Sequence, residues 1–392
     1  MKLFLQYLFI LSVFVFSCQQ PNDVLPCIDV RKNYPEKEIL LTDIAQITYL
    51  CPNSDEREYL FSGGICVVTK NTVVIADARK GDILFFSKEG IPKSHFNRQG
   101  NGPGEYRSPI WVLYDEDADD VFVTYFSSTI IQVYSSTGVH KRELALPQGT
   151  RMGNDWVSYD DDAILYYDVG MEYKRVDVDN KNLPAENLVS PFYLISKADG
   201  AVLEHIELPI PSFFLGINHN GMRIPASRKI RLTKGNTGVL LCNPERDTVF
   251  LYGRGKPLTP ILHKIPLVNA TTPMTYLNNC LDLGSYQFME VYTVRAGDVY
   301  PGIFPVTYYL RNKKSGEIFR QKLLLPDFKG QEFIIRPLGN GRRIENGDYF
   351  ELDITELKQA YAENKLSGKL KELVATLKED DNNVYVIAEF KE

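Results

Sequence analysis

The sequence predicts an all-β protein built from repeated strand hairpins, with a short helical stretch near the C-terminus. Aromatic residues make up 12% of the 392 residues, and the 23 tyrosines and 21 phenylalanines far outnumber the two tryptophans, a composition that favours strands. The segment Val73–Gly90 is repeated as Val121–Gly138 at a constant offset of 48 residues. Strand-like segments also stand at both ends of the chain, at Glu38–Leu50 and Val384–Phe390.

The first 17 residues have the pattern of a secretory signal peptide. Lys2 precedes an apolar run, Leu3–Phe16, that would be about 21 Å long as a helix, against about 30 Å of bilayer hydrocarbon. A run of this length predicts a signal-peptide core rather than a membrane span. Residues 15–18, Val-Phe-Ser-Cys, resemble a bacterial lipobox, which predicts cleavage before Cys18 and lipidation of its sulfur. The alternative is an ordinary secretory signal followed by an incidental cysteine.

The segment after the predicted cleavage site differs in composition from the rest of the chain. Residues 18–35 are polar and hold three prolines, so we expect a tether that joins the lipid anchor to one folded domain at 36–392. The net charge of −6 lacks the concentrated positive field that nucleic-acid binding requires. We therefore expect contact with the membrane through the anchor and no nucleic-acid partner.

Five cysteines follow Cys18, and an odd number cannot all pair within one chain. Cys66 and Cys242 lie in apolar strand-like runs, which predicts inert core residues. Cys27 and Cys51 could form a disulfide in an oxidising compartment.

The internal repeat indicates how the strands are organised. It aligns Val73 with Val121, Ile83 with Ile131 and Gly90 with Gly138, so that strand matches strand and turn matches turn. Self-similarity at a period of about 40–50 residues is typical of a propeller or a solenoid. Further strand pairs are predicted at Ala163–Gly170 with Phe192–Gly200, at Thr237–Gly255 and at Val306–Pro326.

Two helices are expected near the C-terminus. Asp353 could cap the first, and Glu356 three residues later would complete a capping box. After Ser367, apolar residues at helical spacing mark one face of the second: Leu370, Leu373, Val374 and Leu377. A ring of sheets must close, and pairing the first strand-like segment with the last would remove exposed edges. We therefore expect Glu38–Leu50 to pair with Val384–Phe390.

Four segments carry a resemblance to a known family: Arg98–Tyr106 (RQGNGPGEY), Asp43–Leu50, Arg246–Pro260 and Leu377–Phe390. They span nearly the whole mature chain, in order, and the chain resembles the six-bladed β-propeller lipoproteins common in Bacteroidota. The usual ending of that family has a proline where this chain has Asn383. The resemblance implies an exported six-bladed propeller, lipid-anchored at the outer membrane on its periplasmic or surface face. Most members of the family lack an assigned activity.

The glycine-rich stretch within Arg98–Tyr106 could be taken for a phosphate-binding loop, but three features argue against it. The spacing is G-x-G-x-G at Gly100, Gly102 and Gly104, Pro103 lacks an amide donor, and strand-like residues rather than a helix follow. We expect a crossover turn between blades. Glu105 would accept hydrogen bonds from loop amides or pair with Arg98, and Tyr106 would pack on the next blade.

Catalytic residues have little local support in the sequence. Asp77 and Asp168 each end a strand-like run and are the candidates for an acid–base pair in a central channel. The acidic runs Tyr114–Asp120 and Tyr159–Asp162 read as solvated turns rather than calcium loops. The five histidines are scattered, with no metal-ligand spacing, so we predict no metal and no cofactor.

The best candidate for recognition is an aromatic and glycine-containing loop, Phe213–Pro225, within a long irregular insertion. Its candidate binding residues are Phe213, Phe214, His219 and Arg223. The leading hypothesis is a non-enzymatic binding or scaffold module for a glycan, a peptide or an envelope protein. The alternative is a channel-centred enzyme, either a carboxylate glycosidase or a metal-dependent lyase.

Overall fold

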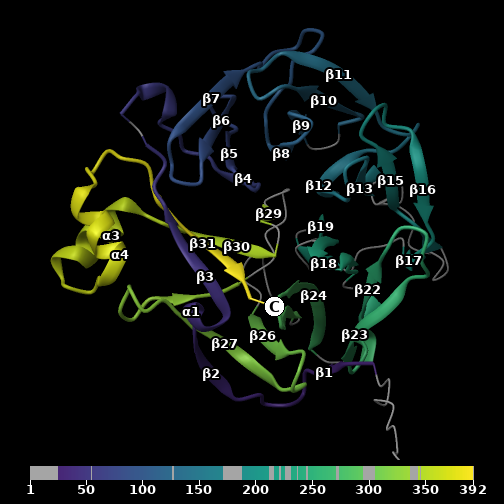
Figure 1. The fold of residues 1–392 in the computed structure, drawn as a ribbon. Coiled ribbons are helices and arrows are strands. Elements are labelled where there is room, and N and C mark those ends of the chain that lie inside the picture. The colour runs from purple at the N-terminus through teal and green to yellow at the C-terminus, as the bar shows by residue number, and fades with distance from the viewer. Residues whose placement is uncertain are drawn as a thin grey trace, which may run out of the picture.

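The fold was analysed in a computed structural model. It describes residues 25–53, 55–125, 128–170, 188–211, 216–219, 222–225, 231–235, 237–243, 246–270, 273–294, 305–335, 343–344 and 346–391. Five large sheets of four or more strands account for most of these residues. They follow one another around a ring, as Figure 1 shows.

Each of the first three strand sets around the ring is an antiparallel meander. The first set is β4 (Gly64–Val68), β5 (Thr72–Asp77), β6 (Asp82–Ser87) and β7 (Pro92–Asn97). The second is β8 (Trp111–Asp115), β9 (Asp120–Thr124), β10 (Ile130–Tyr134) and β11 (His140–Ala145). The third is β12 (Met152–Ser158), β13 (Ala163–Asp168), β15 (Phe192–Ser196) and β16 (Val202–Ile206).

The remaining sets continue the ring. One holds β20 (Leu232–Gly235), β21 (Gly238–Leu241), β22 (Thr248–Tyr252) and β23 (Thr259–Ile265). The next holds β24 (Met274–Leu283), β25 (Tyr286–Val294), β26 (Val306–Asn312) and β27 (Ile318–Leu324). The last holds β29 (Arg343–Ile344), β30 (Gly347–Leu352), β31 (Val384–Phe390) and β3 (Ala45–Leu50), and the parallel pair β29–β4 joins it to the first set in one eight-stranded sheet.

Shorter elements lie outside these meanders. They are β1 (Cys27–Asp29), β2 (Glu36–Leu40), α1 (Leu41–Ile44), η1 (Arg57–Tyr59), β14 (Leu188–Val189), β17 (Ile210–Pro211), β18 (Gly216–His219), β19 (Met222–Pro225), η3 (Val268–Ala270), β28 (Glu332–Phe333), α3 (Ile354–Ala362) and α4 (Gly368–Thr376). No helix in the described part of the chain is long and apolar enough to span a membrane.

The internal repeat of the sequence is a structural repeat. Val73 and Val121 lie in β5 and β9, the second strands of neighbouring sets. Gly90 and Gly138 lie in matching turns that follow the third strands, β6 and β10. Their φ angles are 84° and 80°, a backbone conformation that glycine adopts without strain. The other three predicted strand pairs are confirmed as β13–β15, β21–β22 and β26–β27.

The ring closes by pairing the two ends of the described chain. β3 runs antiparallel to β31, with Ala45 opposite Phe390 and Leu50 opposite Tyr385, as predicted. The predicted strand Glu38–Leu50 is nevertheless two strands separated by the helical turn α1. Leu41 and Ile44, three residues apart on that turn, are both buried, so the turn packs into the core and redirects the chain.

The N-terminal segment binds the outer edges of three consecutive strand sets. β1 runs parallel to β23, β2 runs parallel to β27, and β3 completes the set that contains β31. Ile28 of β1 is fully buried. The tether predicted at 18–35 is therefore too long: from Cys27 onward the chain forms a strand and belongs to the folded domain.

Apolar clusters fill the spaces between neighbouring strand sets. One joins the first set to the second, with Cys66, Val74, Val112 and Tyr134 among its members. Another joins the last set to the first and includes Ile75, Tyr349 and Ile387. Because each cluster draws residues from two neighbouring strand sets, the sets stabilise one another around the ring.

The two predicted helices are present beside the ring, where Figure 1 draws them in yellow. Asp353 caps α3 by accepting hydrogen bonds from the amides of Thr355 and Glu356. Leu370 and Val374 of α4 are buried, as the spacing predicted. Ser367 precedes α4 without a side-chain capping bond.

All five described cysteines are free, so the structure contains no bridge between Cys27 and Cys51. Cys66, Cys242 and Cys280 are buried, consistent with the prediction that the first two are core residues.

Candidate binding crevice

The glycine-rich loop between β7 and β8 uses its backbone amides internally. The Gly102 amide donates to Oε2 of Glu105 over 2.7 Å. The Gly100 amide donates to the Tyr106 carbonyl over 3.0 Å, and the Tyr106 amide donates to the Arg98 carbonyl over 3.1 Å. Glu105 therefore accepts from a loop amide, one of the two roles expected for it, while the Arg98 guanidinium donates to the Gly138 carbonyl over 2.9 Å.

Tyr106 holds this loop against the ring. Its ring is 1% exposed, and its hydroxyl donates to the Gly81 carbonyl over 2.8 Å and accepts from the Arg98 amide over 2.9 Å. Burial raises the pKa of the Tyr106 hydroxyl. Gly104 has φ of +68°, and a Cβ at this position would lie 3.1 Å from the His140 ring. The loop is thus a packed crossover between two sheets, and Pro103 lies within it.

Asp77, a candidate catalytic residue, is fully buried at the end of β5. Its Oδ2 accepts from the Ser62 amide over 2.8 Å, and its Oδ1 accepts from the amides of Arg79 at 3.0 Å and Lys80 at 3.1 Å. Burial raises the pKa of Asp77, but the hydrogen bonds from Ser62, Lys80 and Arg79 outweigh it and hold the pKa below its ordinary value. The carboxylate organises backbone turns.

Asp168 occupies the corresponding place at the end of β13, in a different sheet, and is 1% exposed. Its Oδ1 accepts from the amides of Arg151 and Gly170, both over 2.8 Å. Each of the two carboxylates thus serves the turns of its own strand set. Among the described residues, no group of three or more His, Cys, Asp or Glu side chains is arranged to hold a metal ion.

The predicted recognition loop contains a β-hairpin, in which β18 pairs with β19 and Gly216 lies opposite Pro225. Figure 1 draws this hairpin toward the middle of the ring. His219 and Arg223 lie in its two strands. Phe213 and Phe214 lie outside the described residues, as does Cys18.

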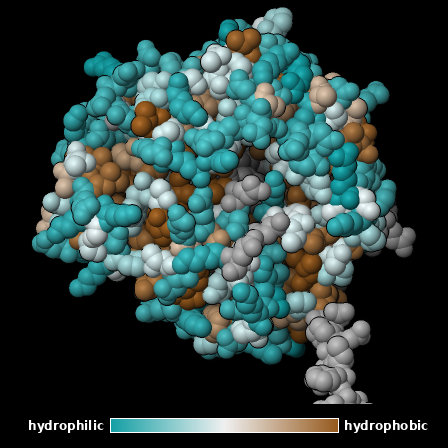
Figure 2. Space-filling model, in the orientation of Figure 1, coloured by the Kyte–Doolittle hydropathy of each residue, from teal (hydrophilic) through white to brown (hydrophobic). Residues whose placement is uncertain are grey.

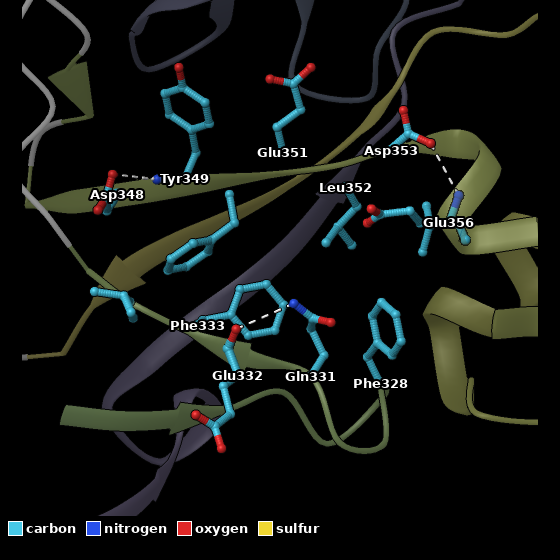
Figure 3. A pocket seen from close by; sticks show the side chains of 13 residues that line it. Phe328, Gln331, Glu332, Phe333, Asp348, Tyr349, Glu351, Leu352, Asp353 and Glu356 are labelled. Carbon is cyan, nitrogen blue, oxygen red and sulfur yellow. Dashed lines mark hydrogen bonds between the residues drawn. The ribbon is translucent and has the colours of Figure 1, made fainter. Parts of the chain in front are cut away.

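A crevice that was not predicted from the sequence lies between the β24–β27 set and the last set, next to α3 (Figure 3). Its volume is about 360 Å³. The lining comes from residues 328–334, from β30 and from the start of α3. The lining residues are Phe328, Gln331, Glu332, Phe333, Ile334, Asp348, Tyr349, Phe350, Glu351, Leu352, Asp353, Glu356 and Leu357.

Aromatic and aliphatic side chains form the interior of the crevice. Phe333 packs edge-on against Phe350, with ring centroids 4.8 Å apart, and Phe333 is 5% exposed. Because side chains alternate along β30, Phe350 and Leu352 share one face of the strand and Tyr349 lies on the other. Tyr349 donates its hydroxyl hydrogen bond to the Ile65 carbonyl over 3.0 Å, away from the crevice.

Five carboxylates line the crevice, and no lysine, arginine or histidine is among its lining residues. Four of them have partners. Asp353 caps α3, and Asp348 Oδ1 accepts from the Tyr349 amide over 2.8 Å. Glu351 accepts from Asn383 Nδ2 over 2.8 Å, and Glu332 lies 3.6 Å from Lys322.

Glu356 differs from the other four carboxylates. Figure 3 shows its carboxylate turned toward Leu352 and the middle of the crevice. Within the described residues, the Glu356 carboxylate has no hydrogen bond or ion pair, so only the Asp353 half of the predicted capping box is formed. The sequence placed Glu356 on the first turn of a helix; only the fold places it over an aromatic crevice.

Comparison with known proteins agrees with the fold. Residues 18–189 match the model of a protein family described as 6-bladed beta-propeller. A crystal structure of a Bacteroides fragilis protein described as exported is similar over 94% of this chain and 100% of that chain, with 15% identity and a TM-score of 0.62. The fold is that of a β-propeller, and both findings agree with the propeller fold predicted from the sequence.

Other solved structures are more distant. A DUF4221-family member from Bacteroides vulgatus has 12% identity and a TM-score of 0.46, over 89% of this chain and 97% of that chain. An inactive variant of virginiamycin B lyase from Staphylococcus aureus, with quinupristin, has 13% identity and a TM-score of 0.36, over 68% of this chain and 80% of that chain. No curated protein matches the sequence.

Proposed function

We propose that this chain is an exported, lipid-anchored β-propeller of six blades that acts as a non-enzymatic binding module for a peptide, protein or glycan of the cell envelope. The blade count is supported by the eight-stranded sheet, which consists of two four-stranded sets joined at β29 and β4. Anchoring rests on the lipobox-like residues that end at Cys18.

The crevice beside α3 is the observation that carries the binding role. It combines a volume of about 360 Å³ with an aromatic interior and a carboxylate that has no partner in the described part of the chain. Pockets with an apolar lining and a few polar groups are the usual form of a binding site. The non-enzymatic part of the proposal is supported by Asp77 and Asp168, the two candidates for an acid–base pair. Their carboxylates accept hydrogen bonds from backbone amides, and they lie in separate sheets.

Replacement of Phe350 by arginine tests the binding role, because the long cationic side chain would occupy the crevice and pair with its carboxylates. Immobilised wild-type protein should capture a defined set of partners from envelope extracts, and the Phe350→Arg variant should lose them. Ile110→Arg is the matched control, since Ile110 is 41% exposed and lies in the loop before β8. Equal capture by wild type and Phe350→Arg would refute the crevice as the binding site.

The anchor is tested separately in the producing cell. A Cys18→Ser variant should fail to incorporate a labelled fatty acid and should leave the membrane fraction. Retention of the variant in the membrane with unchanged labelling would contradict lipidation at Cys18.

A further inference from the structure

We infer that the crevice accepts the side chain of a lysine or arginine from an exposed peptide segment of the partner. This inference rests on the proposed binding function and specifies its ligand. The observation behind it is that the side chains lining the crevice offer mainly hydrogen-bond acceptors and aromatic faces, and none of them carries a positive charge.

The donor and acceptor inventory is one-sided. Gln331 and Tyr349 are the two lining residues whose side chains carry N–H or O–H donors when the acids are ionised. One N–H of Gln331 Nε2 donates to the Glu332 carbonyl over 3.3 Å, and the Tyr349 hydroxyl donates to the Ile65 carbonyl. The acceptors are five carboxylates and the side-chain carbonyl of Gln331, so acceptors outnumber donors. Ammonium and guanidinium groups are donors without acceptors, so they complement such a lining.

Among the ion pairs of the described residues, the one cation that approaches a carboxylate of the crevice is Lys322. Lys322 approaches Glu332 at 3.6 Å, but it lies closer to Glu38, at 2.9 Å, and also contacts Glu36 at 3.5 Å. Figure 3 shows Glu332 pointing away from Phe333 and out of the crevice. The Glu356 carboxylate is solvent-exposed, turned toward the middle of the crevice and, in the described part of the chain, without an ion-pair partner, so an incoming cation can reach it.

The aromatic interior suits the rest of a cationic side chain. Phe328, Phe333 and Phe350 line the crevice. A cation over a phenyl face gains electrostatic attraction, and the methylene stem of lysine or arginine packs on apolar surface. Such an occupant would bury its stem against the rings and place its charged end near Glu356.

A sugar is a weaker fit, although aromatic rings also bind sugars. Each sugar hydroxyl is both a donor and an acceptor, and among the lining side chains only the second N–H of Gln331 could serve the acceptor half. An anionic ligand would meet five carboxylates of the same charge. The lining thus favours a basic peptide over a glycan.

The test uses four short synthetic peptides of the form acetyl-Gly-Gly-X-Gly-Gly-amide, in which X is lysine, arginine, norleucine or N-acetyl-lysine. Norleucine keeps the aliphatic stem and removes the charge, and acetylation neutralises the amine. Binding to the purified protein is followed by NMR titration at low and high salt. We expect the lysine or arginine peptide to bind roughly three- to thirtyfold more tightly than its neutral counterparts, and the difference to shrink in high salt.

A pair of glutamate variants places the effect at the crevice. Glu356→Gln should weaken the cationic peptides by roughly two- to fivefold and leave the norleucine peptide unchanged. Glu363→Gln removes the same charge at the other end of α3, where Glu363 pairs with Lys365 at 2.6 Å. This variant should bind the cationic peptides and the norleucine peptide as tightly as the wild type does. Both substitutions are at exposed positions, and thermal melting should give the same transition for both variants as for the wild type.

Each contrary result has one meaning. Equal affinity for lysine and norleucine peptides would refute cation recognition while leaving the crevice as a binding site. If Glu356→Gln and Glu363→Gln weaken binding of the cationic peptides equally, the loss of affinity comes from the overall charge of the protein, and the assignment to the crevice is refuted. Binding of neutral oligosaccharides in place of all four peptides would refute the inference in favour of a glycan. If Phe350→Arg captures the same partners as the wild type, the crevice is refuted as the binding site of the proposed function.

Discussion

Lys264 and Asp247 form an ion pair of 2.7 Å inside the protein, with their side chains 0% and 4% exposed. Asp247 Oδ2 also accepts a hydrogen bond from the Val268 amide over 2.8 Å, and Lys264 Nζ donates to the Pro266 carbonyl over 2.5 Å. The pair thus ties β23 to the loop that precedes β22 and to the segment that leads toward β24. A buried charge that loses its partner is strongly destabilising.

Replacement of Lys264 by methionine should therefore lower the free energy of unfolding by about 3–5 kcal/mol, because Asp247 is left charged and buried. The double variant Lys264→Met/Asp247→Asn removes both charges and should recover most of the loss. Denaturant unfolding at pH 7 measures both. A single variant that costs less than about 1 kcal/mol would show that the pair is dispensable.

Tyr106→Phe tests how the glycine-rich loop is held. The change removes a buried hydroxyl and leaves the Gly81 carbonyl and the Arg98 amide without their hydrogen bond. We expect a loss of about 1–3 kcal/mol in unfolding free energy, measured by thermal or chemical denaturation. Tyr361→Phe, on the exposed side of α3, is the control and should be neutral.

Asp77→Asn should show a pH-dependent effect. The amides around Asp77 favour the carboxylate and lower its pKa, so they stabilise the fold above the ordinary carboxyl pKa and lose this contribution as the pH falls through the folded-state pKa. At pH 7 the variant should be less stable by about 1–3 kcal/mol, and the gap should narrow below about pH 4. Asp161→Asn, at an exposed turn, should show no such trend. If the difference in unfolding free energy between the wild type and Asp77→Asn is constant with pH, a stabilising role for the Asp77 charge is contradicted.

Removal of residues 384–392 should prevent folding, because β31 pairs with both β30 and β3. The chain would lose the strand that joins its two ends, and circular dichroism and limited proteolysis should report an unfolded or heterogeneous product. A chain that begins at Leu25 retains every described strand and should unfold in one cooperative transition. Cooperative folding of the C-terminally truncated chain would mean that the closure is not required.

Deletion of residues 213–225 separates the predicted recognition loop from the crevice. If the loop also contributes to binding, the deletion should abolish capture of envelope partners while the protein stays folded. If the deletion variant still captures the envelope partners and Phe350→Arg does not, recognition is assigned to the crevice alone.

Much of the fold follows from local patterns. The offset of 48 residues between Val73 and Val121 identified a repeating strand unit, and the apolar spacing of Leu370 and Val374 identified a helix. The N-terminal strands were harder to find. Cys27–Asp29 has three residues and no alternating pattern, and it becomes a strand only because β23 offers an edge more than 200 positions later.

The candidate site was less accessible from the sequence than the fold. Asp77 and Asp168 were singled out because each ends a strand, yet that same position surrounds their carboxylates with backbone amides. The crevice joins Phe333 to Phe350 and Glu356 across two strand sets and a helix. The one local pattern among these residues, the capping box that includes Glu356, indicated a helix start and not a binding site.

The sequence alone determined the elements whose causes are local: hydrophobic alternation within strands, glycine at turns with positive φ, and Asp353 at the start of α3. Tertiary structure alone decided which side chains meet, because contacts between sheets depend on the closure of the whole ring. The edge bound by β1 and the crevice that faces Glu356 both arise from that closure.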